Sequence, residues 1–173
     1  MSMVKKNTNE ILHKLDFIDD ADDETILIAL KSNIPDYKMA YLLNRHLSVR
    51  FEKATDDISL TTDTGVAYFR TFAFQDTKNH LVWRLLENKS NYSENTTEQP
   101  HSLFTNENTL FTATNYLVNE WKNIDFFILI ENADLFFNPE ELLEKLQDIK
   151  NLSTHFLVEW DSLSIKTQKN LIF

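Results

Sequence analysis

The sequence contains no cysteine, and this absence excludes several kinds of chemistry at once. Disulfide bonds, thiol nucleophiles, cysteine-ligated zinc and iron–sulfur clusters all require that side chain. The N-terminal stretch Met1 to Glu10 carries two lysines but no apolar run behind them, so we expect no signal peptide. No stretch of the chain approaches the roughly 20 apolar residues that span a bilayer. We therefore expect a cytoplasmic protein.

Glycine is almost absent, because Gly65 is the only one in 173 residues. Phosphate-binding loops need several glycines so that the backbone can approach the anion, and a nucleophile elbow needs them for its strained turn. A P-loop, a G-x-G-x-x-G fingerprint and a G-x-S-x-G elbow are therefore impossible in this chain. The most common sequence signatures of nucleotide-binding proteins and hydrolases are thereby excluded.

Basic residues are also scarce: 17 Lys and Arg stand against 27 Asp and Glu, which gives a net charge of −10. Neutralisation of phosphates supplies most of the affinity of a nucleic-acid-binding protein, and it requires a basic patch. The basic residues rarely cluster here, whereas the acidic residues are spread along the chain. We expect neither nucleic acid nor an anionic membrane as a partner.

Metal-binding patterns are missing as well. No two histidines have the i, i+4 spacing of a zinc-binding helix, and H-E-x-x-H does not occur. The acidic stretch 19–24 lacks the glycine and the ligand spacing of an EF-hand loop, so we interpret it as a solvated turn between two strands. We predict neither a metal nor a cofactor.

Apolar residues, in contrast, are plentiful: 42% of the chain is hydrophobic, and 13 residues are phenylalanine. A chain of this length buries roughly two thirds of its unfolded surface, which is enough for a core without disulfides or metals. Residues 1–10 are typical of a disordered tail, and residues 11–173 of a single domain. The run 88–101, rich in Asn, Ser, Thr and Glu, predicts a mobile loop.

The hydrophobic pattern predicts an α+β fold, with a mostly antiparallel sheet and two or three helices packed on one of its faces. Two predicted helices begin with an asparagine cap and a nearby proline, at Asn33 and at Asn138. A third helix is expected over 162–171. The run 124–131 is the best candidate for the centre of the sheet, because it is almost entirely apolar. The predicted strands are 12–18, 25–30, 49–53, 66–74, 80–87, 112–118, 124–131 and 154–160.

The segment 116–126 places two carboxylates beside apolar residues, since Glu120 precedes a short turn and Asp125 opens an apolar strand. Such a carboxylate must be paired, hydrogen-bonded or protonated. In one hypothesis the two acids form a pair for acid–base catalysis. In the other they fix the turn by accepting backbone N–H groups or the guanidinium of Arg70 or Arg84. The second hypothesis is favoured, because turn-binding carboxylates are common and no nucleophile or metal partner is visible.

Aromatic residues supply candidate anchors for a partner, although most aromatics in a chain of this size belong to the core. Trp121 and Phe126 lie next to the two carboxylates in sequence. Phe136 and Phe137 lie just before the helix cap at Asn138, where one ring can act as a hydrophobic staple. The other ring is then free to face a partner.

The segment around the two carboxylates resembles the motif of the IPExxxVDY family of small uncharacterised bacterial proteins. The motif falls on Val118-Asn119-Glu120 and, after three residues, on Ile124-Asp125-Phe126. Glu120 and Asp125 match its two acids, and Asn119 stands where the family has proline. The stretches 34–44 and 169–173 are also similar to the family. The resemblance covers the chain from about residue 12 to its end and implies no known activity, substrate or cofactor.

Three functions remain open at this point. The first, which we favour, is a non-catalytic binding or adaptor protein whose partner is another protein or a second copy in a homodimer. It predicts an exposed apolar patch rimmed by charge. The second is a small enzyme with Glu120 and Asp125 as paired acids and His155 or Arg70 nearby, in which both carboxylates point into one pocket and at least one has a raised pKa. The third is an acidic inhibitor or immunity-type protein, whose binding to a basic target weakens steeply with added salt.

Overall fold

The computed structural model describes residues 24–62, 65–90, 93–94, 114–134 and 136–172, and within them the chain adopts the predicted α+β architecture. The helices are α1 (Asp36–Leu47), α2 (Pro139–Gln147) and α3 (Ile165–Leu171), with the short 3-10 helices η1 (Asn119–Trp121) and η2 (Trp160–Ser162). The strands are β1 (Glu24–Lys31), β2 (Glu52–Lys53), β3 (Ile58–Thr62), β4 (Gly65–Phe69), β5 (Thr71–Asp76), β6 (Leu81–Glu87), β7 (Lys89–Ser90), β8 (Ser93–Glu94), β9 (Asn115–Tyr116), β10 (Phe126–Ala133) and β11 (Thr154–Val158).

The main sheet has six strands in the order β11-β1-β10-β6-β5-β2, and every neighbouring pair is antiparallel. The long strands β1 and β10 lie side by side, with Leu27 opposite Leu129 and Ala29 opposite Phe127. Both are apolar on their two faces because both faces of the sheet are covered. The run predicted for the centre of the sheet is therefore found there, as β10.

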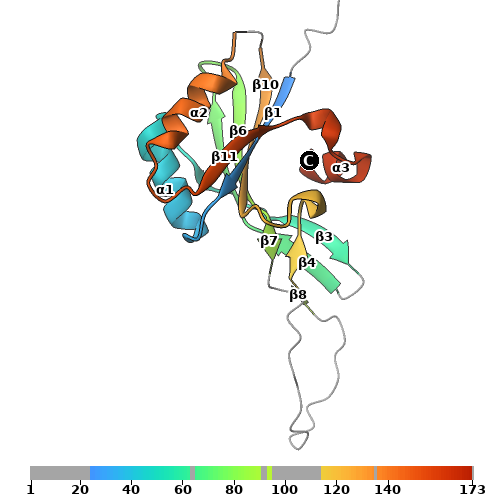
Figure 1. Ribbon diagram of the computed structural model, residues 1–173. Helices are drawn as coiled ribbons and strands as arrows, with labels where there is room; N and C mark the ends of the chain where they lie inside the picture. Colours follow the sequence, from blue (N-terminus) through green and yellow to red (C-terminus); the bar gives the residue numbers. More distant parts are fainter. Residues whose placement is uncertain (1–23, 63–64, 91–92, 95–113, 135, 173) are drawn as a thin grey trace, which may run out of the picture.

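Helices α1 and α2 cover one face of this sheet (Figure 1). Met39 and Leu43 of α1 and Leu142 and Leu146 of α2 pack in one buried cluster with the alternate residues of β1 and β10 that point to this side, Ile26, Ile28, Leu30, Ile128 and Ile130. The spacing of three and four residues within each helix is the one expected for an amphipathic helix on a sheet. These two helices confirm the predicted layer.

The opposite face is covered by α3, by the segment that leads into β10, and by a small sheet of order β3-β4-β8. Here the other set of alternate residues of β1 and β10 forms a second cluster, together with Phe69, Leu117, Leu163 and Leu171. Helix α3 thus packs on the face that α1 and α2 leave open (Figure 1). Two helices share the predicted face, and the third lies on the other side of the sheet.

The predicted strand 66–74 is wrong in one respect, because the chain forms two strands there, β4 and β5, which belong to different sheets. The break falls at Arg70. Phe69, before it, packs in the α3 cluster, whereas Phe72, after it, packs in the α1–α2 cluster. The chain leaves the small sheet and enters the main sheet within one residue. The predicted hairpin that follows is confirmed as β5 and β6, with Phe72 opposite Leu85.

Three further predictions concern the ends of elements. Asn138 caps α2 as predicted: its side chain accepts the backbone N–H groups of Glu140 and Glu141. Asn33 does not cap α1, since Pro35 occupies the N-cap position and the helix has no side-chain cap. The predicted loop does not begin at residue 88, because Asn88 is buried and β7 follows it directly. The predicted strand 12–18, the acidic stretch 19–23 and the tail 1–10 lie outside the described residues.

Candidate functional site

The segment with the two acids is held by Asn88, a residue that the sequence placed in a loop. Its side-chain amide donates to the carbonyl oxygens of Trp121 and Ile124 at 2.9 and 3.0 Å, and its Oδ1 accepts the N–H of Val118 at 2.8 Å. Its backbone N–H donates to the carbonyl of Asp125, and its own carbonyl accepts from Leu117. Asn88 is fully buried, and each of these bonds replaces a hydrogen bond to water that burial removes. Its amide therefore braces the segment structurally.

Asp125 is fixed by three partners near the ends of β1, β6 and β10. Lys89 Nζ lies 2.5 Å from Oδ1, Lys31 Nζ lies 3.1 Å from Oδ2, and the backbone N–H of Ser32 donates to Oδ2 at 3.0 Å. Burial alone would raise the pKa of this carboxyl, but the bonds from Lys89, Ser32 and Lys31 outweigh it and hold the pKa below its usual value. Asp125 is therefore a carboxylate that joins strands. Its cations are two lysines, not the predicted Arg70 or Arg84.

Glu120 has a separate role at the start of α3. One of its oxygens accepts the backbone N–H of Ser164 at 3.2 Å, and Thr167 Oγ1 lies 2.9 Å from both oxygens. Ser164 also caps α3 by accepting the N–H of Thr167. Desolvation alone would raise the pKa of Glu120. The hydrogen bonds from Ser164 and Thr167 lower the pKa by more than desolvation raises it, so the pKa lies below its usual value. This carboxylate ties the N-terminus of α3 to η1 and gains from the helix dipole.

The two acids are thus engaged by different partners, and neither has the raised pKa that an acid–base pair requires. The aromatic neighbours are equally occupied. Trp121 packs against the ring of Phe156 at a centroid distance of 5.1 Å, and Phe126 is buried in the α1–α2 cluster. Phe126 therefore offers no outward ring, and Trp121 is only partly exposed. The observed contacts of the two carboxylates are ones that support the fold.

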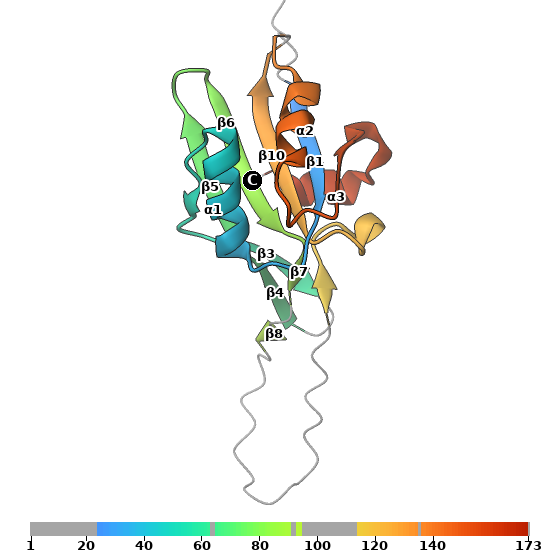
Figure 2. The same cartoon turned by 60° about the vertical axis from the view of Figure 1, so that its left-hand side comes forward.

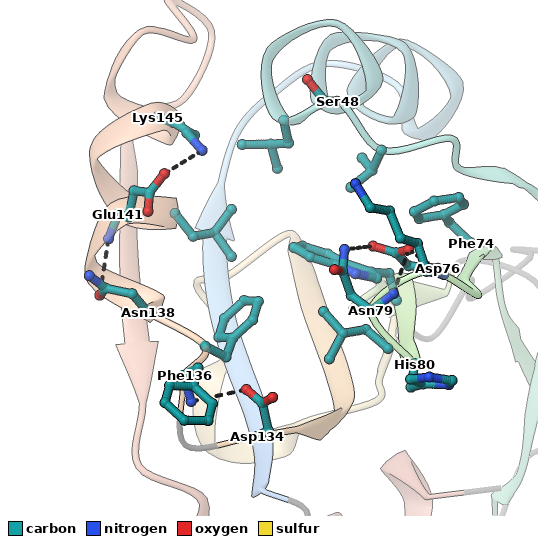
Figure 3. A pocket seen from close by; sticks show the side chains of 17 residues that line it. Ser48, Phe74, Asp76, Asn79, His80, Asp134, Phe136, Asn138, Glu141 and Lys145 are labelled. Carbon is teal, nitrogen blue, oxygen red and sulfur yellow. Dashed lines mark hydrogen bonds and ion pairs between the residues drawn. The ribbon is translucent and has the colours of Figure 1, made fainter.

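A pocket of about 660 Å³ lies at the other end of the main sheet. It is walled by the C-terminal end of α1, the β5–β6 hairpin, and the chain between β10 and α2 (Figure 3). Its volume falls in the range of about 300–1,000 Å³ that is usual for binding sites. The apolar part of its lining consists of Leu47, Val49, Phe74, Leu81, Trp83, Phe136, Phe137 and Leu142.

The polar groups around this pocket are largely satisfied by one another, as the dashed lines in Figure 3 show. Asp76 accepts the side-chain amide of Asn79 at 2.6 Å, and Glu141 pairs with Lys145 at 2.7 Å. Asp134 accepts the backbone N–H of Phe136 at 3.0 Å. These contacts fix the rim and leave the apolar lining as the surface that has most to gain from an occupant.

Two walls of the pocket contain residues with a left-handed backbone, which is uncommon outside glycine. Ser48, just after α1, has a φ of 58°, and His80, in the hairpin, has a φ of 59°. Asn132, with a φ of 62°, donates its side-chain amide to the carbonyl of His80 at 3.4 Å. This bond links the hairpin to the end of β10 beside the pocket.

Three aromatic residues, Phe136, Phe137 and Trp83, distinguish this pocket from an ordinary surface hollow. Phe136 is 91% exposed at its rim (Figure 3), whereas the next residue, Phe137, packs edge-on against Trp83 at 5.9 Å. Trp83 is 7% exposed, and its Nε1–H donates to no atom of the described residues. Of the Phe pair, Phe137 is thus the packed ring and Phe136 the outward one, and that the outward ring faces a partner stays a prediction. The sequence marked Trp83 only as one of three tryptophans that could be exposed anchors, and it placed neither Trp83 nor His80 at a pocket, because the pocket joins segments that are far apart along the chain.

No family model matches the chain, no curated protein matches it, and no solved structure matches it. The resemblance to the IPExxxVDY family therefore stays a prediction. Among the described residues, no group of three or more His, Cys, Asp or Glu side chains is placed to hold a metal ion. Within the same residues, no helix has both the length and the apolar character needed to cross a membrane.

Proposed function

We propose that this chain is a non-catalytic binding protein of the cytoplasm, and that the pocket beside Phe136 receives an apolar side chain of a protein partner. The observation that carries the proposal is the exposed ring of Phe136 at the rim of a pocket with an aromatic floor. Burial of aromatic surface is the main source of binding energy at protein interfaces. The absence of cysteine suits a reducing compartment and supports the cytoplasmic location.

A protein partner fits this site better than a small molecule. A ligand that only filled the pocket would leave most of the ring of Phe136 in water, because this lining residue is 91% exposed. A partner surface that covers the rim would bury Phe136 and at the same time insert a side chain against Phe137 and Leu142. Asp76, Glu141 and Asp134 at the rim already have hydrogen-bond or ion-pair partners, so a partner surface that covers them need not supply new ones.

The acidic pair offers less support for catalysis. Glu120 and Asp125 bind different elements, and each has a pKa below its usual value. A general acid or base near neutral pH needs the opposite shift for a carboxyl group. The binding role is therefore the better account of the described geometry.

The test is site-specific photocrosslinking in living cells of the source species. A benzophenone amino acid is placed at Phe136 in one variant and at Ile165 in another, since both side chains are exposed and they lie on opposite faces of the main sheet. We expect a discrete protein adduct from position 136 that is absent from position 165. Loss of this adduct on Leu142→Glu, in a variant that remains folded, ties it to the pocket. No adduct at 136, or the same adducts from both positions, overturns the proposal.

A further inference from the structure

Helix α1 carries exposed tyrosines and unpaired positive charge on its outer side. Tyr37 is 66% exposed and Tyr41, one turn later, is 61% exposed. Lys38 and Arg45 are exposed on the same helix. The only acidic residue of α1, Asp36, is buried and binds Arg70 at 3.1 Å. The outer side of this helix is therefore aromatic and basic, in a chain whose net charge is −10.

Helix α2 carries the opposite charge. Glu140, Glu144 and Asp148 follow one another at intervals of four residues, so they form one stripe along the helix and its C-cap, and all three are exposed. Within the described part of the chain none of them has an ion pair, and neither do Lys38 and Arg45 of α1. The positive charge of Lys145 is already neutralised by Glu141.

The two helices lie side by side in one layer and run in opposite directions. Each follows a strand of the antiparallel pair β1 and β10 and turns back over it, so α1 and α2 are antiparallel to each other (Figure 2). The layer thus presents a basic, tyrosine-bearing half next to an acidic half. A surface with this division is complementary to itself when one copy is turned by 180° about an axis parallel to the helices.

We propose that the outer faces of α1 and α2 form the interface of a homodimer with this twofold axis. In this arrangement α1 of each copy lies against α2 of the other copy, and the tyrosines are buried between them. A twofold axis perpendicular to the helices would instead place α1 on α1, with like charges facing each other, and is therefore disfavoured. The inference goes beyond the proposed function, because it uses other residues than the pocket and Phe136.

The direction of the helices fixes which charges meet. The first turn of α1 lies beside the last turn of α2, and rotation about an axis parallel to the helices keeps this order. Lys38 of one copy therefore faces Asp148 of the second copy, and Arg45 faces the end of α2 that carries Glu140 and Glu144. Each dimer contains this set of contacts twice, because the interface is isologous. Tyr37 and Tyr41 supply the large, low-entropy contact area at its centre.

The experiment measures association by sedimentation velocity over a wide concentration range, with the full chain and two charge-reversal variants. We expect the wild type to be a dimer. Lys38→Glu with Arg45→Glu makes both helices acidic, and Glu144→Lys with Asp148→Lys makes both basic. Each double variant should dimerise at least roughly tenfold more weakly than the wild type. A mixture of the two should restore association as a heterodimer, because each basic helix then faces an acidic one.

The control is Lys166→Glu with Lys169→Glu, which makes the same change of net charge on the exposed side of α3. It should leave the dimer intact. A wild type that stays monomeric at every concentration overturns the proposal, and so does a mixture of folded variants that fails to associate. If the Lys variants of α2 do not fold, Tyr37→Ala with Tyr41→Ala provides the second test, and a dimer unchanged by it also overturns the proposal. None of these outcomes bears on the photocrosslink at position 136.

Discussion

Asn88 Oδ1 accepts the backbone N–H of Val118 over 2.8 Å, although the two residues are 30 positions apart in the sequence. The same side chain reaches the carbonyls of Trp121 and Ile124, so it spans the turn that carries Glu120 and ends before Asp125. The stretch from Val118 to Ile124 forms no strand, and the buried side chain of Asn88 binds backbone groups there that a neighbouring strand would otherwise bind. The carboxylates and aromatic rings of the segment are positioned by this amide.

The first prediction concerns this brace. Asn88→Ala leaves the N–H of Val118 and the carbonyls of Trp121 and Ile124 without their partner in a buried place. Each such loss costs about 1–3 kcal/mol, so we expect the free energy of unfolding to fall by about 3 kcal/mol or more. Urea denaturation measures it, with the exposed neighbour Asn119→Ala as the control. An effect of Asn88→Ala no larger than that of the control would contradict the role of Asn88.

The second prediction concerns the pH dependence conferred by Asp125. The pKa of this carboxyl is lower in the folded protein than its ordinary value of 3.8, so the unfolded chain takes up the proton first as the pH falls. The stabilisation is therefore complete above the unfolded pKa and is lost as the pH drops through the folded pKa. Asp125→Asn should lower the free energy of unfolding by about 1–3 kcal/mol at pH 7, because Lys31 and Lys89 then face a neutral amide in place of a carboxylate.

The measurement is the free energy of unfolding of wild type and Asp125→Asn between neutral and strongly acidic pH. The difference between the two proteins should begin to shrink near pH 4, where the unfolded wild-type chain takes up the proton, and it should vanish once the folded carboxyl is protonated as well. Asp161→Asn, an exposed carboxylate in η2, is the matched control. A difference that stays constant down to the lowest pH would show that the charge of Asp125 contributes nothing.

The third prediction concerns Glu120 and the start of α3. Glu120→Gln removes the negative charge that binds Ser164 and Thr167, while the shape of the side chain is kept. We expect faster hydrogen exchange of the amides of α3, with no change in α2 on the other face of the sheet, since the contact is local. Exchange followed by mass spectrometry separates the two helices. Glu159→Gln, exposed just before η2, controls for the loss of charge alone.

The fold was predictable where the hydrophobic pattern and the local chemistry agree. The unbroken apolar runs of β1 and β10 identify strands buried on both faces, and the cap at Asn138 identifies the start of α2. The change of sheet at Arg70 was not predictable. Ala67 and Phe69 point to one face, and Phe72 and Phe74 to the other, so the alternation of a single strand continues through the break.

The candidate site shows the same limit of the sequence. The place of Phe136 and Phe137 before a helix cap indicated that one ring packs and the other can face outward, but not which of the two does so. Asn88 could not be identified, because asparagine in a polar run is normal in a loop and its role depends on contacts at least 29 positions away (Asn88 to Leu117). The charges of α1 and α2 were visible as residues, but their complementarity depends on the helices lying side by side.

The last prediction concerns Glu87, whose carboxyl is half-buried at the end of β6. Burial, and to a smaller extent the charge of Asp36, raise its pKa above the ordinary value of 4.5, and Arg70 opposes this only partly. The folded protein therefore holds this proton more tightly than the unfolded chain, and stability falls as the pH rises from the unfolded pKa through the folded one. Glu87→Gln removes the charge that causes this loss.

We expect Glu87→Gln to be more stable than the wild type at pH 7, by less than about 1 kcal/mol because the site is only half-buried. The gain should disappear below about pH 4, where the carboxyl is protonated in both the folded and the unfolded chain. Thermal unfolding at a series of pH values measures both effects, and Glu52→Gln on the exposed strand β2 is the control. If the Gln variant is less stable at pH 7, the attraction of Arg70 outweighs burial and the sign of the pKa shift is reversed.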